Sequence, residues 1–384
     1  MFNDIKQAIS YIESKRTKRT FLMFKETVEK YHFNIHQKNM IHIAGTNGKG
    51  STTTFIRDLL MQHGYRVGTF TSPYIVSHNE RMCINGKAIS DERLLEIINE
   101  FYEMIEKERL SMFEIDVLIM LKYFDEEDLD YRIIECGIGG LNDKTNVIDS
   151  CVSVITNIGY DHQFMLGNTL SEIALQKAGI IKEHQMFYTT EQNQNLLSIF
   201  KDHCHQKETS FHEVKVPEIT HFPYQIPFLN YTYTLNHGGS YQVKNALLAL
   251  YVCHDLIELD TDKIQTVLNQ FNWPGRFERF GKFILDGAHN QDGIQALIQT
   301  IQDQKLTDVG IVFSALNDKD IDHMLAMLKD FDVMMASFDD DRSNHQGRDF
   351  KEALSLMAAK HQTVVVTGSL HFISTVRKYV ENRP

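Results

Sequence analysis

The sequence predicts an α/β fold with two domains, each built on a mostly parallel sheet that is covered by helices. From residue 40 onward, short apolar runs rich in Ile and Val alternate with longer amphipathic segments. The alternation is broken at Trp273-Pro274-Gly275-Arg276 and then begins again. With a length of 384 residues, we expect an N-terminal domain over residues 1–272 and a smaller C-terminal domain over residues 273–384.

The N-terminal domain is predicted to begin with helices, because apolar residues recur at three- and four-residue spacing through residues 1–32. Its strands are expected at residues 40–44, 66–71, 131–137 and 152–157. Residues 187–243 carry three prolines, and the alternating segment 229–235 is typical of a β-hairpin arm. A helix is expected over residues 245–257.

The C-terminal domain is predicted to be a Rossmann-like, doubly wound unit, since about a hundred residues of alternating strand and helix suffice for one. Its expected strands are residues 282–286, 309–314, 333–338 and 363–367. Its expected helices are residues 290–303, 321–331, 350–360 and 372–382.

The composition argues against a membrane-spanning or secreted protein. Hydrophobic residues make up 42%, and no run approaches the roughly 18–20 apolar residues that a membrane span needs. The N-terminus has no apolar signal segment, and the five cysteines form no C-x-x-C pair. We expect a cytoplasmic monomer with structural cysteines.

The net charge of −12 argues against nucleic-acid binding, which needs a clustered basic field. The longest basic run, Lys15-Arg16-Thr17-Lys18-Arg19, is interpreted as a solvated surface. An acidic chain can still bind an anion through local backbone N–H groups, a few cations and metal ions.

The strongest motif is a P-loop-type phosphate loop. The strand at Ile41-His42-Ile43-Ala44 leads into Gly45-Thr46-Asn47-Gly48-Lys49-Gly50-Ser51-Thr52, and a helix over residues 52–63 follows. Glycines turn backbone N–H groups around an anion, Lys49 supplies charge for the phosphates, and Ser51 supplies a hydroxyl for Mg²⁺. A glycine-rich turn with a surface lysine is the simpler interpretation, but the order of strand, glycines, lysine, hydroxyl and helix favours nucleotide binding.

Two possible metal ligands end predicted strands, and a lysine ends a predicted helix. Glu135 and His162 follow apolar runs, so they and the hydroxyls of Ser51 and Ser72 could hold Mg²⁺ at the sheet edge. Histidine is an uncommon ligand for this hard cation, and a lone strand-end histidine is more often a core residue. Lys177 lies in the last turn of a helix that opens with a capping box at Thr169, where a surface lysine would be ordinary.

Motifs along nearly the whole chain resemble those of folylpolyglutamate synthases and dihydrofolate synthases, members of the Mur ligase superfamily. The residues that carry the resemblance are the loop AGTNGKGST at 44–52, Ser72-Pro73, Asn79-Glu80-Arg81, Asn85-Gly86, Glu135-Cys136-Gly137-Ile138-Gly139-Gly140, Asp161-His162, Lys177-Ala178-Gly179-Ile180, Gln242, Asn245-Ala246, Pro274-Gly275-Arg276 and Leu285-Asp286-Gly287-Ala288-His289-Asn290.

The resemblance implies roles for these positions. It assigns ATP to Thr46, Asn47, Gly48, Lys49, Gly50, Ser51, Thr52, Asn245, Arg276 and Asp286. It assigns a first Mg²⁺ to Ser72, Glu135 and His162, and a second Mg²⁺ to a carbamate formed on Lys177. His289 is implied at the acyl-phosphate or glutamate site, and Asn142, Asp143 and Lys144 at the folate or pterin site.

The implied reaction is activation of a folate-type carboxylate by ATP, followed by amide formation with L-glutamate. The chain departs from the family pattern at Tyr74, Leu141, Lys144 and Tyr241, where the family has His, Arg, Ala and His. Because Leu cannot replace the paired contacts of Arg, a Mur-type ligase acting on another carboxylate is the alternative. A nucleotide-dependent switch without ligase turnover is the third hypothesis.

Overall fold

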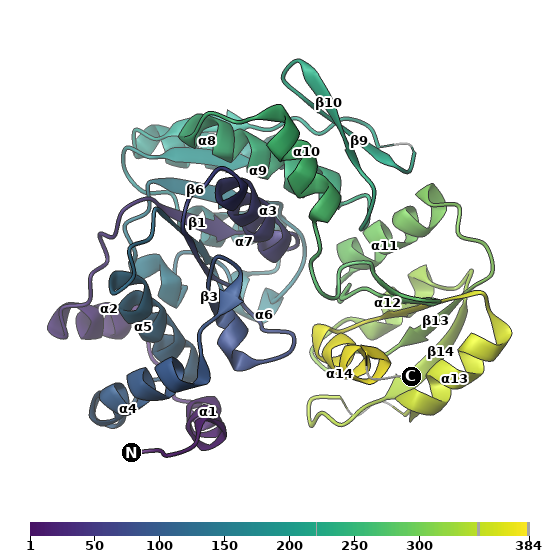
Figure 1. Ribbon diagram of the computed structural model, residues 1–384, viewed down its shortest axis with the longest axis horizontal. Helices are drawn as coiled ribbons and strands as arrows, with labels where there is room; N and C mark the ends of the chain where they lie inside the picture. Colours follow the sequence, from purple (N-terminus) through teal and green to yellow (C-terminus); the bar gives the residue numbers. More distant parts are fainter. Residues whose placement is uncertain (220, 344–345, 382–384) are drawn as a thin grey trace. The chain divides into compact units, whose positions relative to one another are not determined.

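The computed structural model describes residues 1–384 apart from 220, 344–345 and 382–384. It divides into two compact units (Figure 1). Unit 1 contains Met1–Lys215 and Leu248–Lys263, and unit 2 contains Val216–Leu247 and Ile264–Pro384. The helix α9 (Gln242–Leu256) therefore contributes residues to both units.

The sheet of unit 1 has the strand order β4-β3-β2-β5-β1-β6-β7-β8. It is parallel except where β3 pairs with β2 and β4. The strands are β1 (Met40–Ala44), β2 (Val67–Phe70), β3 (Met82–Ile84), β4 (Lys87–Ala88), β5 (Tyr131–Glu135), β6 (Val152–Ile155), β7 (Met186–Thr189) and β8 (Ser210–Glu213). The predicted parallel strands β1, β2, β5 and β6 are confirmed, and they lie next to one another at the centre of the sheet.

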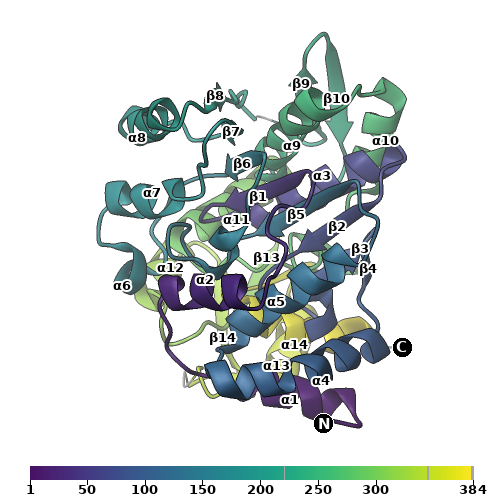
Figure 2. The same cartoon turned by 90° about the vertical axis from the view of Figure 1, so that its left-hand side faces the viewer.

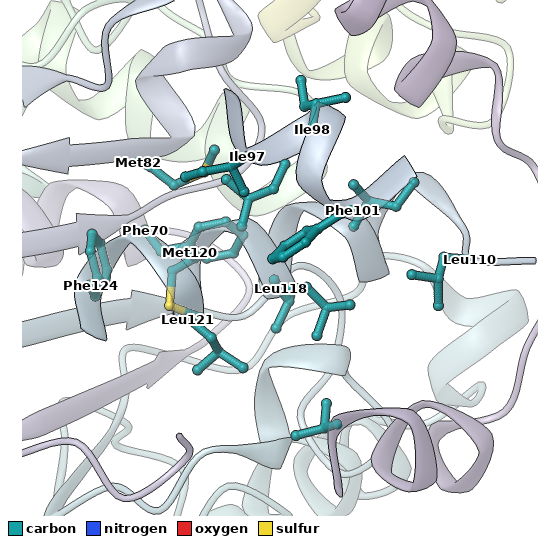
Figure 3. Packing of buried hydrophobic residues seen from close by; sticks show 14 of the residues in the cluster. Phe70, Met82, Ile97, Ile98, Phe101, Leu110, Leu118, Met120, Leu121 and Phe124 are labelled. Carbon is teal, nitrogen blue, oxygen red and sulfur yellow. The ribbon is translucent and has the colours of Figure 1, made fainter. Parts of the chain in front are cut away.

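Helices cover both faces of this sheet. They are α1 (Ile5–Ser14), α2 (Phe21–Lys30), α3 (Lys49–Gln62), α4 (Asp91–Glu108), α5 (Met112–Asp125), α6 (Gln163–Leu166), α7 (Leu170–Ala178) and α8 (Gln194–Gln206). Figure 2 shows α2, α4 and α5 on one side of the central strands and α3 on the other. Phe70 of β2 packs with Phe101, Leu118 and Phe124 of α4 and α5 in a core from which water is excluded (Figure 3).

The sheet of unit 2 has the order β11-β12-β16-β13-β14-β15 and is parallel apart from the pair β11–β12. Its strands are β11 (Glu278–Phe280), β12 (Phe283–Leu285), β13 (Val309–Phe313), β14 (Asp332–Ser337), β15 (Arg348–Asp349) and β16 (Thr363–Thr367). One face packs on α13 (Phe350–Lys360) and α14 (Leu370–Glu381), and the other on α11 (Gln291–Asp303) and α12 (Ile321–Met327). The predicted doubly wound arrangement is confirmed.

Several predicted boundaries differ from the structure. Helix α3 begins at Lys49 rather than Thr52, because Gly48 provides its N-cap. Helix α12 ends at Met327, four residues before the predicted end, and a turn at 328–331 leads into β14. The hairpin pairs β9 (Tyr224–Phe228) with β10 (Tyr231–Leu235) in unit 2. The predicted end of the last helix, Asn382, lies outside the described residues. The helix that follows α9 in the chain, α10, spans Thr261–Gln270.

Candidate active site

The phosphate loop of unit 1 connects β1 to α3 through residues 45–48. Gly48 has φ +88° and is the N-cap of α3, so no side chain there bonds to the first N–H groups of the helix. A Cβ on Gly45 would lie 1.8 Å from Oγ1 of Thr156, which only a glycine can tolerate. The result is a helix N-terminus whose partial positive charge is open to an anion.

The loop is held in shape by the segment that follows β6. The amide of Thr46 donates to the Asn157 carbonyl at 3.0 Å, and the amide of Asn47 donates to Oδ1 of Asn157 at 2.9 Å. The amide of Gly159 donates to Oγ1 of Thr46 at 2.9 Å. These bonds fix the loop before any ligand arrives and bring the residues leading to His162 to the same edge of the sheet.

Two ammonium groups contact one carbonyl in this loop. Nζ of Lys177 donates to the Gly45 carbonyl at 2.9 Å, and Nζ of Lys49 donates to the same oxygen at 3.2 Å. Lys177 is only 3% exposed, which excludes the simpler interpretation of a surface lysine. Burial and the neighbouring charge of Lys49 lower the pKa of Lys177 to about 7. The amines of Lys49 and Lys177 therefore lie so close together that repulsion disfavours a positive charge on both.

A buried carboxylate lies beside these amines. Oε1 of Glu135, at the end of β5, is 3.9 Å from Nζ of Lys49, and Oε2 accepts from the amide of Ser72 at 3.3 Å. The structure thus brings Lys49, Ser72, Glu135 and Lys177 together. Ser51 is buried in the first turn of α3. His162 has φ +49°, an uncommon conformation for a non-glycine residue, and its Nε2 lies 3.7 Å from Oδ2 of Asp161.

Among the predicted metal ligands, Ser51, Ser72 and Glu135 offer the oxygen atoms that a hard cation takes. Over the part of the chain that the structure describes, no three His, Cys, Asp or Glu side chains are grouped so that they could hold a metal ion. The predicted set contains only Glu135 and His162 of these types, and its other members are Ser51, Ser72 and a modified Lys177. One buried carboxylate with hydroxyl oxygens suits Mg²⁺, which keeps several of its waters and binds phosphate oxygens.

The three residues predicted for the folate or pterin site have different environments. Asn142 is exposed. Asp143 is buried and accepts from the amides of Thr145 and Ile138 at 2.9 and 2.8 Å, and its burial raises its pKa. Asp143 therefore holds the start of the short helix η2 (Lys144–Val147).

Lys144 is bound to its own chain. Its Nζ donates to the carbonyls of Arg19 and Thr20 at 2.8 Å each, and it lies 3.1 Å from Oε1 of Glu114. Nη1 of Arg19 lies 3.4 Å from Oε2 of Glu114, with side-chain exposures of 5% and 0%. The interpretation of the basic run as a solvated surface is therefore wrong at Arg19, because the Glu114 carboxylate at the start of α5 pairs with it inside the unit.

Unit 2 brings Arg276, Asp286 and His289 together at the carboxyl end of β12. Asp286 is 3% exposed, and Nδ1 of His289 lies 2.8 Å from the Gly287 carbonyl oxygen. A Cβ on Gly287 would lie 2.5 Å from Nη1 of Arg276, so the guanidinium lies directly against this glycine. Nδ2 of Asn245 donates to Oε1 of Gln242 at 2.9 Å in the first turns of α9.

Comparisons with known proteins decide the family. The Mur ligase middle domain matches residues 43–253, and the Mur ligase glutamate ligase domain matches residues 275–382. The dihydrofolate synthase/folylpolyglutamate synthase of Bacillus subtilis is 33% identical, over 88% of this chain and 89% of the relative. The chain belongs to the folylpolyglutamate and dihydrofolate synthases of the Mur ligase family.

Other members of this family are similarly related. The folylpolyglutamate synthase of Lacticaseibacillus casei is 30% identical, over 89% of this chain and 90% of the relative. The structure of Mycobacterium tuberculosis folylpolyglutamate synthase complexed with ADP has a TM-score of 0.89 and 25% identity, covering 99% of both chains. Membership makes this chain an ATP-dependent ligase of a carboxylic acid and an amino acid, so the switch hypothesis is excluded.

The residues around the phosphate loop of unit 1 and those around Asp286 of unit 2 are called the two half-sites below, each described within its own unit. One residue of each was not assigned a role from the sequence. Asn157 fixes the phosphate loop of unit 1 through its carbonyl and its side chain, and it was included only as the end of a predicted strand. Tyr241 of unit 2 donates its O–H to Oδ2 of Asp286 at 2.6 Å. Its signal was the departure from the family's histidine at this position. Outside the half-sites, in the described part of the chain, all five cysteines are free and no helix is long and apolar enough to cross a bilayer.

Proposed function

We propose that this chain joins L-glutamate to a folate-type carboxylate through an acyl phosphate, releasing ADP and phosphate. The observation that carries the proposal is the gathering of Lys49, the buried amine of Lys177 and the Glu135 carboxylate beside the phosphate loop that opens α3. Lys49 and the first N–H groups of the helix suit the phosphates of ATP, and the buried amine and the carboxylate suit the metal ions that accompany them.

The first step is transfer of the γ-phosphoryl group. A carboxylate oxygen of the acceptor attacks the γ-phosphorus, the bond to the β-γ bridging oxygen breaks, and ADP leaves. Lys49 and the first amides of α3 neutralise the phosphate charge. Ser51, Ser72, Glu135 and His162 would hold Mg²⁺, which supplies further neutralisation. A related bifunctional synthase has been solved with Mn, AMPPNP and L-glutamate bound.

Carbamylation of Lys177 would reverse the sign of its charge. The ammonium first loses a proton, the neutral amine attacks CO₂ to form a C–N bond, and a second proton leaves, so the product is an anionic carbamate. This change removes the repulsion between Lys177 and Lys49 and provides oxygen ligands for a second Mg²⁺. Burial of the amine supports the proposal, because an unpaired cation is costly there.

The second step is attack of the glutamate amino group on the acyl carbon, with release of phosphate and a proton. In the proposed roles, Asn245, Arg276 and Asp286 bind the nucleotide, and His289 serves the acyl phosphate or glutamate. Residues 1–272 supply the phosphate and metal ligands, and residues 273–384 complete the nucleotide and glutamate sites.

A second candidate function is ligation to a carboxylate other than a folate. The observation that favours it is the pairing of Lys144 with Glu114 and two carbonyls, at a position where the family has Ala. The Lys144 ammonium is therefore engaged within the chain, and the buried Glu114 carboxylate is paired with it. Leu141, at the position of the family's Arg, is 47% exposed and offers no charge to an acceptor.

The test is a mass-resolved product assay with dihydropteroate and tetrahydrofolate supplied separately, each with ATP, Mg²⁺ and L-glutamate. We expect one glutamyl residue to be added to at least one acceptor, with phosphate release that requires both acceptor and glutamate. Lys49→Ala provides the inactive control. Phosphate release with glutamate and a non-folate acid, but with neither folate, would favour the second candidate.

A further inference from the structure

The Asp286 carboxylate organises two turns of unit 2. Its Oδ2 accepts from the amide of Phe277 at 3.0 Å, and its Oδ1 accepts from the amide of Ala288 at 3.0 Å. A third bond runs directly between the turns, from the amide of Gly287 to the Gly275 carbonyl at 2.8 Å. One carboxylate therefore joins the turn that carries Arg276 to the turn that carries His289.

Tyr241 supplies the remaining donor to this carboxylate. Its O–H lies 2.6 Å from Oδ2 of Asp286, the same oxygen that accepts from Phe277. The tyrosine comes from the residues just before α9, 45 positions away in sequence. Without it, a carboxylate that is 3% exposed would lose a side-chain O–H donor, and Oδ2 would keep the amide of Phe277.

Arg276 depends on the same arrangement. Its guanidinium lies against Gly287, where a Cβ would come within 2.5 Å of Nη1. A shift of the Asp286 side chain would move Phe277 and Ala288, the immediate neighbours of Arg276 and Gly287. Small displacements of this kind weaken binding because charged contacts to phosphate or ribose oxygens depend on close geometry.

We propose that Tyr241 is a positioning residue for nucleotide binding, whose O–H fixes Asp286 and, through it, Arg276. The inference rests on the proposed function, because it takes Arg276 and Asp286 as nucleotide contacts. A phenol donates without carrying a charge at neutral pH, whereas the histidine found here in the family titrates near pH 6.5. The groups that face Tyr241 are Asp286, Arg276 and Tyr224. This chain therefore has a donor to Asp286 that does not change charge between pH 6 and pH 8.

The experiment compares Tyr241→Phe with Tyr224→Phe, a matched tyrosine of unit 2 whose hydroxyl accepts from Gln304 at 3.4 Å. Calorimetry measures the Kd for ADP, and steady-state kinetics separates KM for ATP from kcat. We expect Tyr241→Phe to raise both Kd and KM by roughly tenfold, as loss of one hydrogen bond to a charged group implies. Tyr224→Phe should leave both constants within twofold of the original chain.

Tyr241→His is the second variant, and it restores a donor if Tyr241→Phe fails to fold. We expect its Kd for ADP to change at least threefold more between pH 6 and pH 8 than that of the original chain, since the imidazole gains a charge beside Arg276. An unchanged Kd in Tyr241→Phe, or an equal loss in Tyr224→Phe, would overturn the inference. If the original chain binds ADP but forms no amide, the proposed function fails, while the ADP comparison still decides the role of Tyr241.

Discussion

The two half-sites differ in how their charged side chains are paired. In unit 1, Lys49 and Lys177 contact one carbonyl oxygen, and the nearby carboxylate of Glu135 is 3.9 Å from Nζ of Lys49. In unit 2, the single carboxylate of Asp286 is matched by two backbone amides and one phenol. The first arrangement places two amines beside one carboxylate, whereas the second surrounds one carboxylate with neutral donors.

The difference distinguishes side chains that bind a ligand, such as Lys49 and Lys177, from a side chain that stabilises the local fold, such as Asp286. Excess positive charge is unfavourable in the folded chain alone, so it is retained where an anion later neutralises it. A carboxylate that is fully hydrogen-bonded stabilises the fold and cannot rearrange cheaply. Substitutions of Lys49 and Lys177 should therefore change catalysis more than stability, and substitutions at Asp286 should change both.

The largest expected effect is that of replacing Lys177. Lys177→Ala should abolish turnover, with kcat reduced by roughly a thousandfold or more, because the proposed carbamate and its metal are lost. Lys177→Met fills the same space without an amine and should be equally inactive. Both variants should melt within a few degrees of the original chain, since they remove a buried charge rather than a bonded network.

Short carboxylates provide a sharper form of this test. Acetate or formate could occupy the cavity that Lys177→Ala leaves and supply the missing oxygen ligands, so partial recovery of activity is expected in that variant. Lys177→Met leaves no such space and serves as the control. Full activity in Lys177→Met would remove the carbamate from the proposed mechanism and with it the contrast between the two half-sites.

A smaller effect, on stability as well as binding, is expected for Asp286→Asn. The amide keeps one acceptor oxygen but points an NH₂ group at one of the donors from Tyr241, Phe277 and Ala288. We expect the free energy of unfolding to fall by roughly 2–4 kcal/mol, the cost of leaving buried donors unmatched. Urea unfolding measures this loss. The control is Asp292→Asn, which makes the same change at an exposed position in the first turn of α11. If Asp286→Asn has an unchanged free energy of unfolding and loses only kcat, Asp286 does not hold the two turns together as described.

The parts of the fold that could be predicted from the sequence are those with strong local patterns. The apolar runs of β1, β5 and β6 predicted central strands, because strands buried on both faces need continuous hydrophobic residues. The short edge strands β4 and β8 were missed, since Lys87–Ala88 and Ser210–Glu213 carry no such run. Edge strands are exposed on one side and tolerate polar residues.

In the candidate site, too, the features that depend on neighbouring residues in sequence were predictable. The loop over residues 45–52 was predictable because its glycines, lysine and hydroxyl are adjacent in sequence. The burial of Lys177 was not, since a basic residue in the last turn of a helix is equally common on a surface. The bond between Tyr241 and Asp286 spans 45 residues, and periodicity within one segment holds no information about such a pair.

A third cluster, in unit 1, shows how a buried histidine between carboxylates contributes to stability. His78 is buried between Asp116, 2.8 Å from Nε2, and Glu13, 3.3 Å from Nδ1, with Arg81 and Tyr74 beside them. Burial alone lowers the pKa of His78, but the two carboxylates outweigh it and raise the pKa to about 9. The folded chain therefore keeps this proton at pH values where the unfolded chain has lost it.

The smallest expected effect is a pH dependence of stability caused by His78. Below about pH 6.5 both states carry the proton and the stabilisation is complete, and it is lost as the pH rises toward 9. We expect the free energy of unfolding in urea to fall by roughly 1–2 kcal/mol between pH 6.5 and pH 8.5. His78→Gln should flatten this slope, whereas substitution of the exposed His36 by Gln should preserve it. A slope that survives in His78→Gln would mean that the charges around Asp116 are balanced without the histidine, as those around Asp286 are balanced by neutral donors.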